Sequence, residues 1–250
     1  MSSKPKVAFF DFAGCEGDQL QIINLEEKLL NVVSLVNIVS FREAMKEQSD
    51  DYDIAFVEGS ITRKSDEARL KKIRKNAKIL VALGSCACFG GINALKNSWA
   101  SLEEVKKRVY GADAHYFETY PARGIDKIVP VDYYIPGCPI EKDEFLRVLK
   151  ALLLGIQPPL PNYPVCVECK KRGNICVFDK GQFCLGPVTR AGCDARCVNE
   201  GNRCWGCRGL VDQPNVNAEK EVLTKYGLTV EDALARFRIY DNYRYEEIKG

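Results

Sequence analysis

The sequence lacks several features that mark common classes of protein. Its 250 residues include a single histidine, His115, for which a surface or core position is favoured over a catalytic or ligand role. No apolar run approaches the roughly 20 residues that cross a bilayer. No apolar leader with a small-residue cleavage site precedes Val7. These absences predict a cytoplasmic protein without a membrane span.

An excess of either charge is also missing. Lys and Arg number 36 against 34 for Asp and Glu, which gives a formal net charge of +2. Because no basic run stands out, we expect no binding to nucleic acid. No pairing of a nucleophile with a base is visible either, so we expect no catalytic residue in this chain.

Cysteine, by contrast, is abundant. Eight of the twelve cysteines fall in one segment: Cys166, Cys169, Cys176, Cys184, Cys193, Cys197, Cys204 and Cys207. In a reducing cytosol this density more often means bound metal than disulfides. Four thiolates hold one [4Fe–4S] cluster, whereas zinc ribbons prefer paired Cys-x2-Cys knuckles. Only the first and last pairs have that spacing, which favours iron–sulfur clusters over a zinc-held interaction module.

The first part of the chain alternates strand-like and helix-like segments. This alternation predicts an α/β domain with a doubly wound, mostly parallel sheet. The expected strands are 7–12, 35–41, 54–57, 79–83 and 132–135, and the expected helices are 19–33, 66–76, 102–109 and 143–154. Ligands bind beyond the carboxyl ends of such strands. Cys15, Cys86 and Cys138 each follow a strand, so we expect the three thiols to meet.

A proline-rich segment divides the chain. Four prolines between Gln157 and Pro164 cannot continue a helix, which predicts domains at 1–160 and 161–250. The second domain has little periodicity and many glycines, and so small a loop-rich domain usually needs metal to hold it together. Short C-terminal helices are expected at 218–226 and 230–237.

Several motifs, taken together, resemble the small subunits of [NiFe] hydrogenases. In the first part they are Gly14-Cys15-x-Gly17, Glu58-Gly59-Ser60, Gly84-Ser85-Cys86-Ala87 and Pro136-Gly137-Cys138-Pro139. In the second part they are Pro164-Val165-Cys166-x2-Cys169, the run from Cys184-Leu185-Gly186-Pro187 to Gly192-Cys193, and Cys204-x-Gly206-Cys207-Arg208-Gly209. The likeness is greatest to the soluble cytoplasmic branch, the sulfhydrogenase delta subunits and the viologen-reducing hydrogenase small subunits.

The resemblance implies a flavodoxin-like domain followed by a small iron–sulfur domain. It implies an electron-transfer subunit that links a [NiFe] large subunit to a flavin or iron–sulfur partner subunit. Three [4Fe–4S] clusters are expected: a proximal one at Cys15, Cys86 and Cys138, a distal one at Cys166, Cys169, Cys176 and Cys184, and a medial one at Cys193, Cys197, Cys204 and Cys207. The alternative is a redox relay subunit of a complex I-like or heterodisulfide reductase-linked complex without hydrogenase activity.

The chain departs from the family pattern at one proximal ligand. The family usually reads Cys-x-Gly-Cys in the first loop, whereas this chain reads Cys15-Glu16-Gly17-Asp18. Three interpretations remain: Asp18 binds the iron, Cys88 replaces the lost thiolate, or one iron stays open. Asp18 is favoured because it occupies the position of the missing cysteine.

Overall fold

The computed structural model describes residues 4–98, 101–212, 221, 223–227 and 229–242. The chain folds as two compact units, Met1–Lys142 and Asp143–Gly250, each of which is described by itself. The predicted division into cluster-binding domains at 1–160 and 161–250 stays a prediction.

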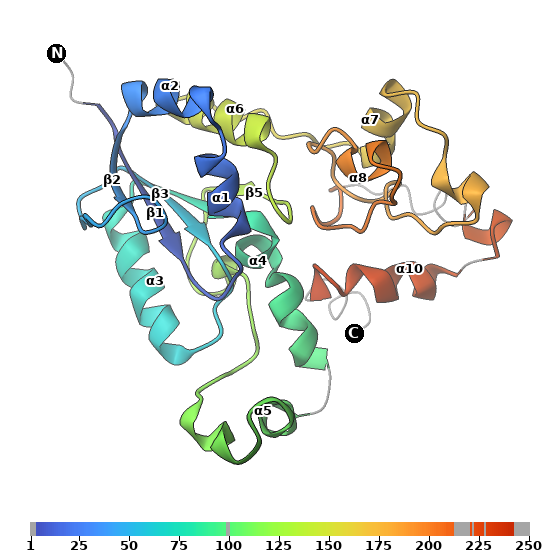
Figure 1. Cartoon of the computed structure of the whole chain (residues 1–250), viewed down its shortest axis with the longest axis horizontal. Helices are drawn as coiled ribbons and strands as arrows, with labels where there is room; N and C mark the ends of the chain where they lie inside the picture. The colour runs from blue at the N-terminus through green and yellow to red at the C-terminus, as the bar shows by residue number, and fades with distance from the viewer. Residues whose placement is uncertain (1–3, 99–100, 213–220, 222, 228, 243–250) are drawn as a thin grey trace. The chain divides into compact units, whose positions relative to one another are not determined.

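The first unit is built on a five-stranded parallel sheet with the order β2-β1-β3-β4-β5 (Figure 1). This is the flavodoxin-like strand order, and the predicted α/β class is confirmed. Each strand lies at or within two residues of its predicted position. The strands are β1 Lys6–Asp11, β2 Asn37–Phe41, β3 Ile54–Glu58, β4 Ile79–Leu83 and β5 Tyr133–Ile135.

Alternate residues of the strands build two apolar faces, since successive side chains point to opposite sides of a sheet. On one face, small strand residues such as Ala8 and Ala55 pack with Leu70 and Ile73 of helix α3, Lys64–Asn76. The other face carries a row of rings from three adjacent strands: Phe9, Phe41 and Phe56. The Phe9 ring centroid lies 4.4 Å from that of Phe41 and 5.2 Å from that of Phe56.

The helix predicted over 19–33 was wrong in one respect, because two helices occupy this stretch. These are α1, Gly17–Ile23, and α2, Glu27–Leu35. The chain turns between them, where Leu25 is buried and Glu26 has a φ of 54°. A right-handed helix does not allow that φ, so the amphipathic pattern continued across a break that it did not reveal.

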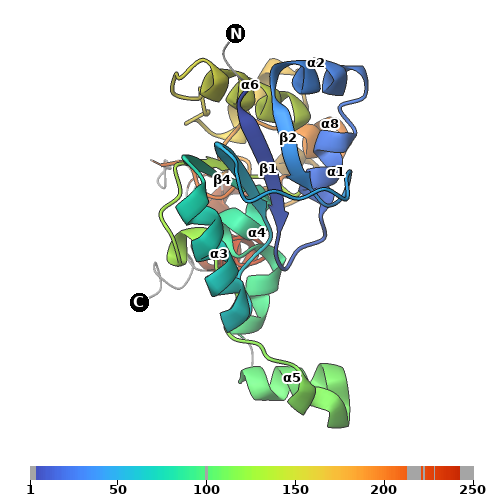
Figure 2. The same cartoon turned by 90° about the vertical axis from the view of Figure 1, so that its left-hand side faces the viewer.

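Past β4 the first unit carries an extension of short helices. Their bounds are α4 Gly84–Phe89, η1 Gly91–Ser98, α5 Leu102–Tyr110, η2 Gly111–Tyr116 and η3 Ile125–Lys127. Helix α5 begins at a capping box, in which Ser101 and Glu104 satisfy each other's backbone amides. Figures 1 and 2 both show α5 standing away from the sheet.

The second unit has short helices around a small apolar core. They are α6 Lys142–Leu153, which begins at the last residue of the first unit, α7 Val165–Lys171, η4 Val177–Lys180, α8 Arg196–Asn199 and α10 Val230–Phe237. The prediction of a helix at 230–237 is confirmed. Of the helix predicted at 218–226, residues 218–220 and 222 lie outside the described residues, and residues 221 and 223–225 are helical. The sequence did not predict α7 and α8. Within the described part of the chain, no helix is long and apolar enough to span a bilayer.

The ring row across β1, β2 and β3 gives a test of the core. Phe56 is 0 % exposed, so Phe56→Ala should lower the free energy of local opening by about 3–5 kcal/mol. Hydrogen exchange of β3 amides, measured by mass spectrometry on the purified complex, reports that change. Leu30→Ala is the control, because Leu30 is 71 % exposed and its loss should change opening by under about 0.5 kcal/mol. Equal protection in both variants would contradict the packing described above.

Candidate metal centres

Three segments at the carboxyl edge of the sheet carry three of the four cysteines of the first unit. Cys15 follows β1, Cys138 follows β5, and Cys86 lies in helix α4 directly after β4. Hydrogen bonds tie these loops together. Both the amide and the hydroxyl of Ser85 donate to the carbonyl oxygen of Gly137 at 2.7 Å. The amide of Ser60 donates to the carbonyl of Ala13 at 2.8 Å, and that of Ala13 to the carbonyl of Ser60 at 3.1 Å.

Two buried carboxylates lie among these loops. Asp18, 6 % exposed, accepts a hydrogen bond from the amide of Ile140 at 2.7 Å, and this bond links the first loop to the Cys138 loop. Glu58, at the end of β3, accepts the amides of Gln19 at 3.0 Å and of Asp18 at 3.4 Å. These amides open helix α1 and have no partner within it. Glu58 therefore holds the start of α1, and with it the loop of Cys15 and Asp18.

The thiols and carboxylates at this edge strongly influence one another. Burial first, and then Glu58, raises the pKa of Asp18 to about 7. Burial first, and then Asp18, raises the pKa of Cys86 to about 12. For Cys138 the pKa rises to about 12 through burial and then through Cys86, Asp18, Cys15 and Glu58. The structure therefore brings the three predicted thiols and Asp18 together.

Gly84 makes room for the Asp18 carboxylate. A Cβ at this residue would stand 1.6 Å from Oδ2 of Asp18, and its φ is +80°. Any L side chain would therefore collide with the carboxylate as well as strain the backbone. Since Gly84 lies two residues before Cys86, the carboxylate sits against the helix that carries this thiol.

Cys88 lies elsewhere. It is 3 % exposed among apolar residues below the sheet edge, and its thiol donates to the carbonyl of Ala82 at 3.7 Å. Residues two apart on a helix do not face each other, so the α4 positions that place Cys86 in the site direct Cys88 into the core.

In the second unit, the sulfurs of Cys166 and Cys184 lie close to Gly186. A Cβ there would lie 3.3 Å from the sulfur of Cys166 and 3.4 Å from that of Cys184. Cys166 and Cys169 share one face of α7, being three residues apart. Burial first, and then among other charges Cys176 and Cys169, raises the pKa of the Cys184 thiol. The thiols predicted for the distal cluster therefore converge.

Three of the other four cysteines, Cys193, Cys204 and Cys207, are related through Cys207 and Arg208. Against the effect of burial, Glu144 first, and then Cys193 and Cys207, raises the pKa of the Arg208 guanidinium. Burial, and then Cys184 and Cys207, raises the pKa of Cys204 well above its ordinary value. Cys197 lies in α8 and is exposed. Cys204 therefore stands between the two groups, and the amide of Cys204 donates to the Cys184 sulfur at 3.3 Å.

The donor sets fit iron–sulfur clusters. The ionisable groups that raise the pKa of Cys138 are all acids, so negative charge collects at the site when they ionise. A bound metal deprotonates its coordinating thiols and offsets this negative charge. Among the described residues, no three His, Cys, Asp or Glu side chains converge tightly enough for a single metal ion. A four-iron cluster is wider than one ion, so that finding concerns single-ion sites alone.

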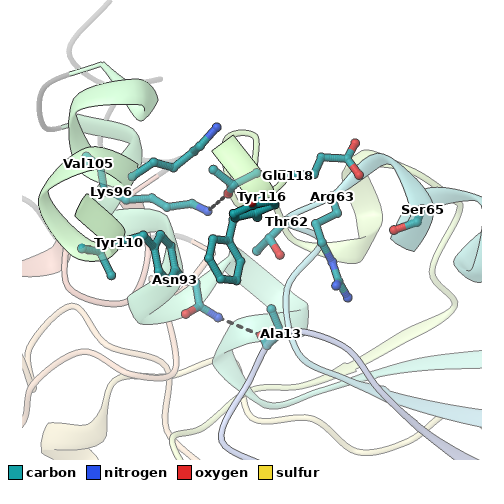
Figure 3. A pocket seen from close by; sticks show the side chains of 14 residues that line it. Ala13, Thr62, Arg63, Ser65, Asn93, Lys96, Val105, Tyr110, Tyr116 and Glu118 are labelled. Atoms are coloured by element: carbon teal, nitrogen blue, oxygen red, sulfur yellow. Dashed lines mark hydrogen bonds between the residues drawn. The ribbon is translucent and has the colours of Figure 1, made fainter. Parts of the chain in front are cut away.

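A pocket of about 600 Å³ lies beside the first loop, between η1, α5 and the residues before α3 (Figure 3). Two of its polar side chains are hydrogen-bonded within the lining: the Asn93 amide donates to the backbone carbonyl of Ala13 at 2.8 Å, and Lys96 donates to the Thr119 hydroxyl at 2.6 Å. No cysteine is among the residues that line it, so this pocket is separate from the candidate metal centres.

Comparison with known proteins identifies the family. The model of the NADH ubiquinone oxidoreductase 20 Kd subunit family matches residues 15–152. The chain belongs to this family. It is 37% identical to the sulfhydrogenase 2 subunit delta of Pyrococcus furiosus, over 87% of this chain and 92% of that protein. It is 34% identical to a subunit of the F420-non-reducing hydrogenase vhu of Methanocaldococcus jannaschii, over 83% of each chain.

A solved structure supports the same assignment. The chain is similar to one in the H2-reduced NAD+-reducing [NiFe]-hydrogenase, with a TM-score of 0.58 and 29% identity, over 63% of this chain and 96% of that chain. The resemblance to hydrogenase small subunits is thereby confirmed, and the chain is an electron-transfer subunit of the hydrogenase kind. With twelve cysteines, these relatives indicate iron–sulfur clusters.

Sequence reasoning missed several residues that shape the sites. Gly84 and Arg208 lie within motifs that resemble those of hydrogenase small subunits. A glycine two residues before a predicted ligand could have indicated that another group lies close to the backbone there. Glu144, which binds Arg208 at 2.7 Å, had no signal, because it lies in an amphipathic helix among other charges.

The contact between Gly84 and Asp18 gives a second prediction. Gly84→Ala should displace the Asp18 carboxylate and shift the reduction potential of one cluster, measured by EPR-monitored redox titration of the purified complex. Gly111→Ala is a matched control, because Gly111 also has a positive φ, +57°, but nothing lies within 4 Å of its Cβ position. Equal effects of the two substitutions would mean that backbone strain, and not Asp18, is responsible.

Proposed function

We propose that this chain is the electron-transfer subunit of a [NiFe] hydrogenase and carries three [4Fe–4S] clusters. The observation that carries the proposal is the meeting of Cys15, Cys86 and Cys138, which are far apart in sequence, at one sheet edge with the Asp18 carboxylate. Iron–sulfur clusters supply one-electron redox chemistry when bound. The chain's own part is to hold their ligands and to shield them from water.

Asp18 is proposed as the fourth ligand at the proximal site. Its carboxylate is buried and raises the pKa of both Cys86 and Cys138. A hydrogen bond from the Ile140 amide holds it in place. The Cys88 side chain points into the core, and its thiol donates a hydrogen bond to the carbonyl oxygen of Ala82. An oxygen ligand of this kind changes a cluster's potential, because ligand type and local charge set it.

The second unit is proposed to hold the other two clusters. Cys166, Cys169, Cys176 and Cys184 are the distal ligands, and Cys193, Cys197, Cys204 and Cys207 are the medial ones. Two amides, those of Gly186 at 3.4 Å and Cys204 at 3.3 Å, donate to the Cys184 sulfur. Hydrogen bonds to cluster sulfurs tune reduction potential, so this thiol is fitted to a redox role.

A [NiFe] large subunit and a flavin or iron–sulfur subunit are the proposed partners, by analogy with the hydrogenase relatives. The family name also covers a subunit of NADH ubiquinone oxidoreductase, which keeps a complex without hydrogenase activity as the second candidate. Hydrogen-dependent reduction of a viologen dye by the purified native complex, together with its nickel content, separates the two. Dye reduction without nickel, or nickel without dye reduction, would oppose the proposed partner. The cytoplasmic location stays a prediction.

Metal analysis tests the three-cluster proposal directly. The purified complex should contain about twelve irons and equal acid-labile sulfide attributable to this chain, on the basis of four irons per cluster. Iron bound to partner subunits is subtracted by analysing the same complex with this chain dissociated. Stoichiometric zinc with almost no iron in this chain would refute the proposal.

Asp18→Cys tests the fourth ligand. Replacing the oxygen donor by a thiolate should shift the potential of one cluster in an EPR-monitored redox titration while the other two stay constant. Cys88→Ala is the control and should leave all three potentials and the iron content unchanged. A titration unaltered by Asp18→Cys would show that Asp18 is not a ligand.

A further inference from the structure

The second unit buries a complete ion pair. Arg208 directly follows Cys207 and is 1% exposed, as is its partner Glu144. One terminal nitrogen of Arg208, Nη2, donates to Oε1 of Glu144 at 2.7 Å. Its Nε donates to the carbonyl oxygens of Ala191 at 2.8 Å and Arg190 at 3.2 Å. The guanidinium is therefore held rigidly, away from solvent, beside a predicted cluster ligand.

The chain leading to Cys193 is shaped around this pair. A Cβ at Gly192 would stand 2.3 Å from Nη2 of Arg208 and 2.5 Å from Oε1 of Glu144, and φ at Gly192 is +121°. Gly192 immediately precedes Cys193. The same guanidinium therefore lies against the backbone next to Cys193 and follows Cys207 in sequence, so two predicted ligands of one cluster flank it.

Burying this ion pair costs more free energy than is needed to hold a loop in place. Removing two charges from water costs several kcal/mol per ion, and well-packed apolar residues of similar volume often stabilise a protein as well or better. None of the described residues donates a hydrogen bond to Oε2 of Glu144. A purely structural role therefore explains the shape of this region but not its charges.

We propose that the buried Arg208–Glu144 pair sets the reduction potential of the cluster bound by Cys193, Cys197, Cys204 and Cys207. The inference rests on the proposed function, since it needs that cluster. Reduction adds one negative charge to a cluster, and charges act strongly across a medium of low dielectric constant. Arg208, beside two of the ligands, favours the reduced form. Glu144, which accepts a hydrogen bond from Nη2 of Arg208, offsets part of that effect.

Two substitutions in the purified complex should therefore act in opposite directions. Arg208→Met keeps the length and the apolar stem but removes the positive charge, so one of the three midpoint potentials should become more negative. Glu144→Gln keeps the shape but removes the negative charge, so the same potential should become more positive. EPR-monitored redox titration measures both shifts, with the other two potentials constant.

Arg172→Met is the matched control. Arg172 belongs to the same unit and pairs with Asp194, the neighbour of Cys193, but the two side chains are 58% and 50% exposed. Water and salt screen an exposed charge, so the three potentials should remain as in the unmodified complex. A shift equal to that of Arg208→Met would overturn the inference, because burial would then not matter.

Several other outcomes would overturn either the inference or the proposed function. Arg208→Met and Glu144→Gln could shift the potential in the same direction, which would show a structural role and overturn the inference. The inference would also be overturned if Arg208→Met lost a cluster while Glu144→Gln kept the potentials of the unmodified complex. Three clusters with unmoved potentials would overturn the inference alone. An unmodified complex in which this chain holds fewer than three clusters would instead refute the proposed function.

Discussion

The burial of several acids at one sheet edge is the constraint on which the first unit depends. Asp18 and Glu58 are buried, and Cys86 and Cys138 are partly buried. Burial, and then neighbouring acids, raises the pKa of Asp18, Cys86 and Cys138. Such a group of anions is unstable unless it binds protons or a cationic centre. The backbone amides that reach the two carboxylates compensate only part of this cost. The metal centre proposed for these thiols would provide the remaining positive charge.

The fold supplies this constraint by simple means. Parallel strands end at a common edge, and short connections to α1 and α4 leave little freedom for the residues that follow. Glycine is required where backbone and side chain approach most closely: Gly59, with φ +88°, has no room for a Cβ beside the backbone of Phe12, and Gly84 has none beside Asp18. The positions of the predicted ligands are thus set by the strand ends, by the first turns of α1 and α4, and by hydrogen bonds between loops.

Much of this was predictable from sequence, for reasons that also mark the limits. Short apolar runs located all five strands, and the strand ends placed Cys15, Cys86 and Cys138 at one edge. The break at Glu26 was not predictable, because a single residue with positive φ leaves the apolar period unchanged. Nor was the pairing of Arg208 with Glu144, which lie 64 residues apart. The periodicity of apolar residues indicates which face of a helix or strand a residue occupies, but not which charged side chain it contacts.

The second unit follows a different logic, in which the predicted sites depend on each other. Its core is small, with Phe178, Phe183 and Phe237 among the buried residues. The amide of Cys204 is bonded to the sulfur of Cys184, and these cysteines belong to different predicted ligand sets. A ligand of one set therefore fixes the backbone of the other. Because metal binding to such a site is coupled to folding, filling one of the two proposed sites would help to order the other, in a loop-rich unit whose apolar core is small.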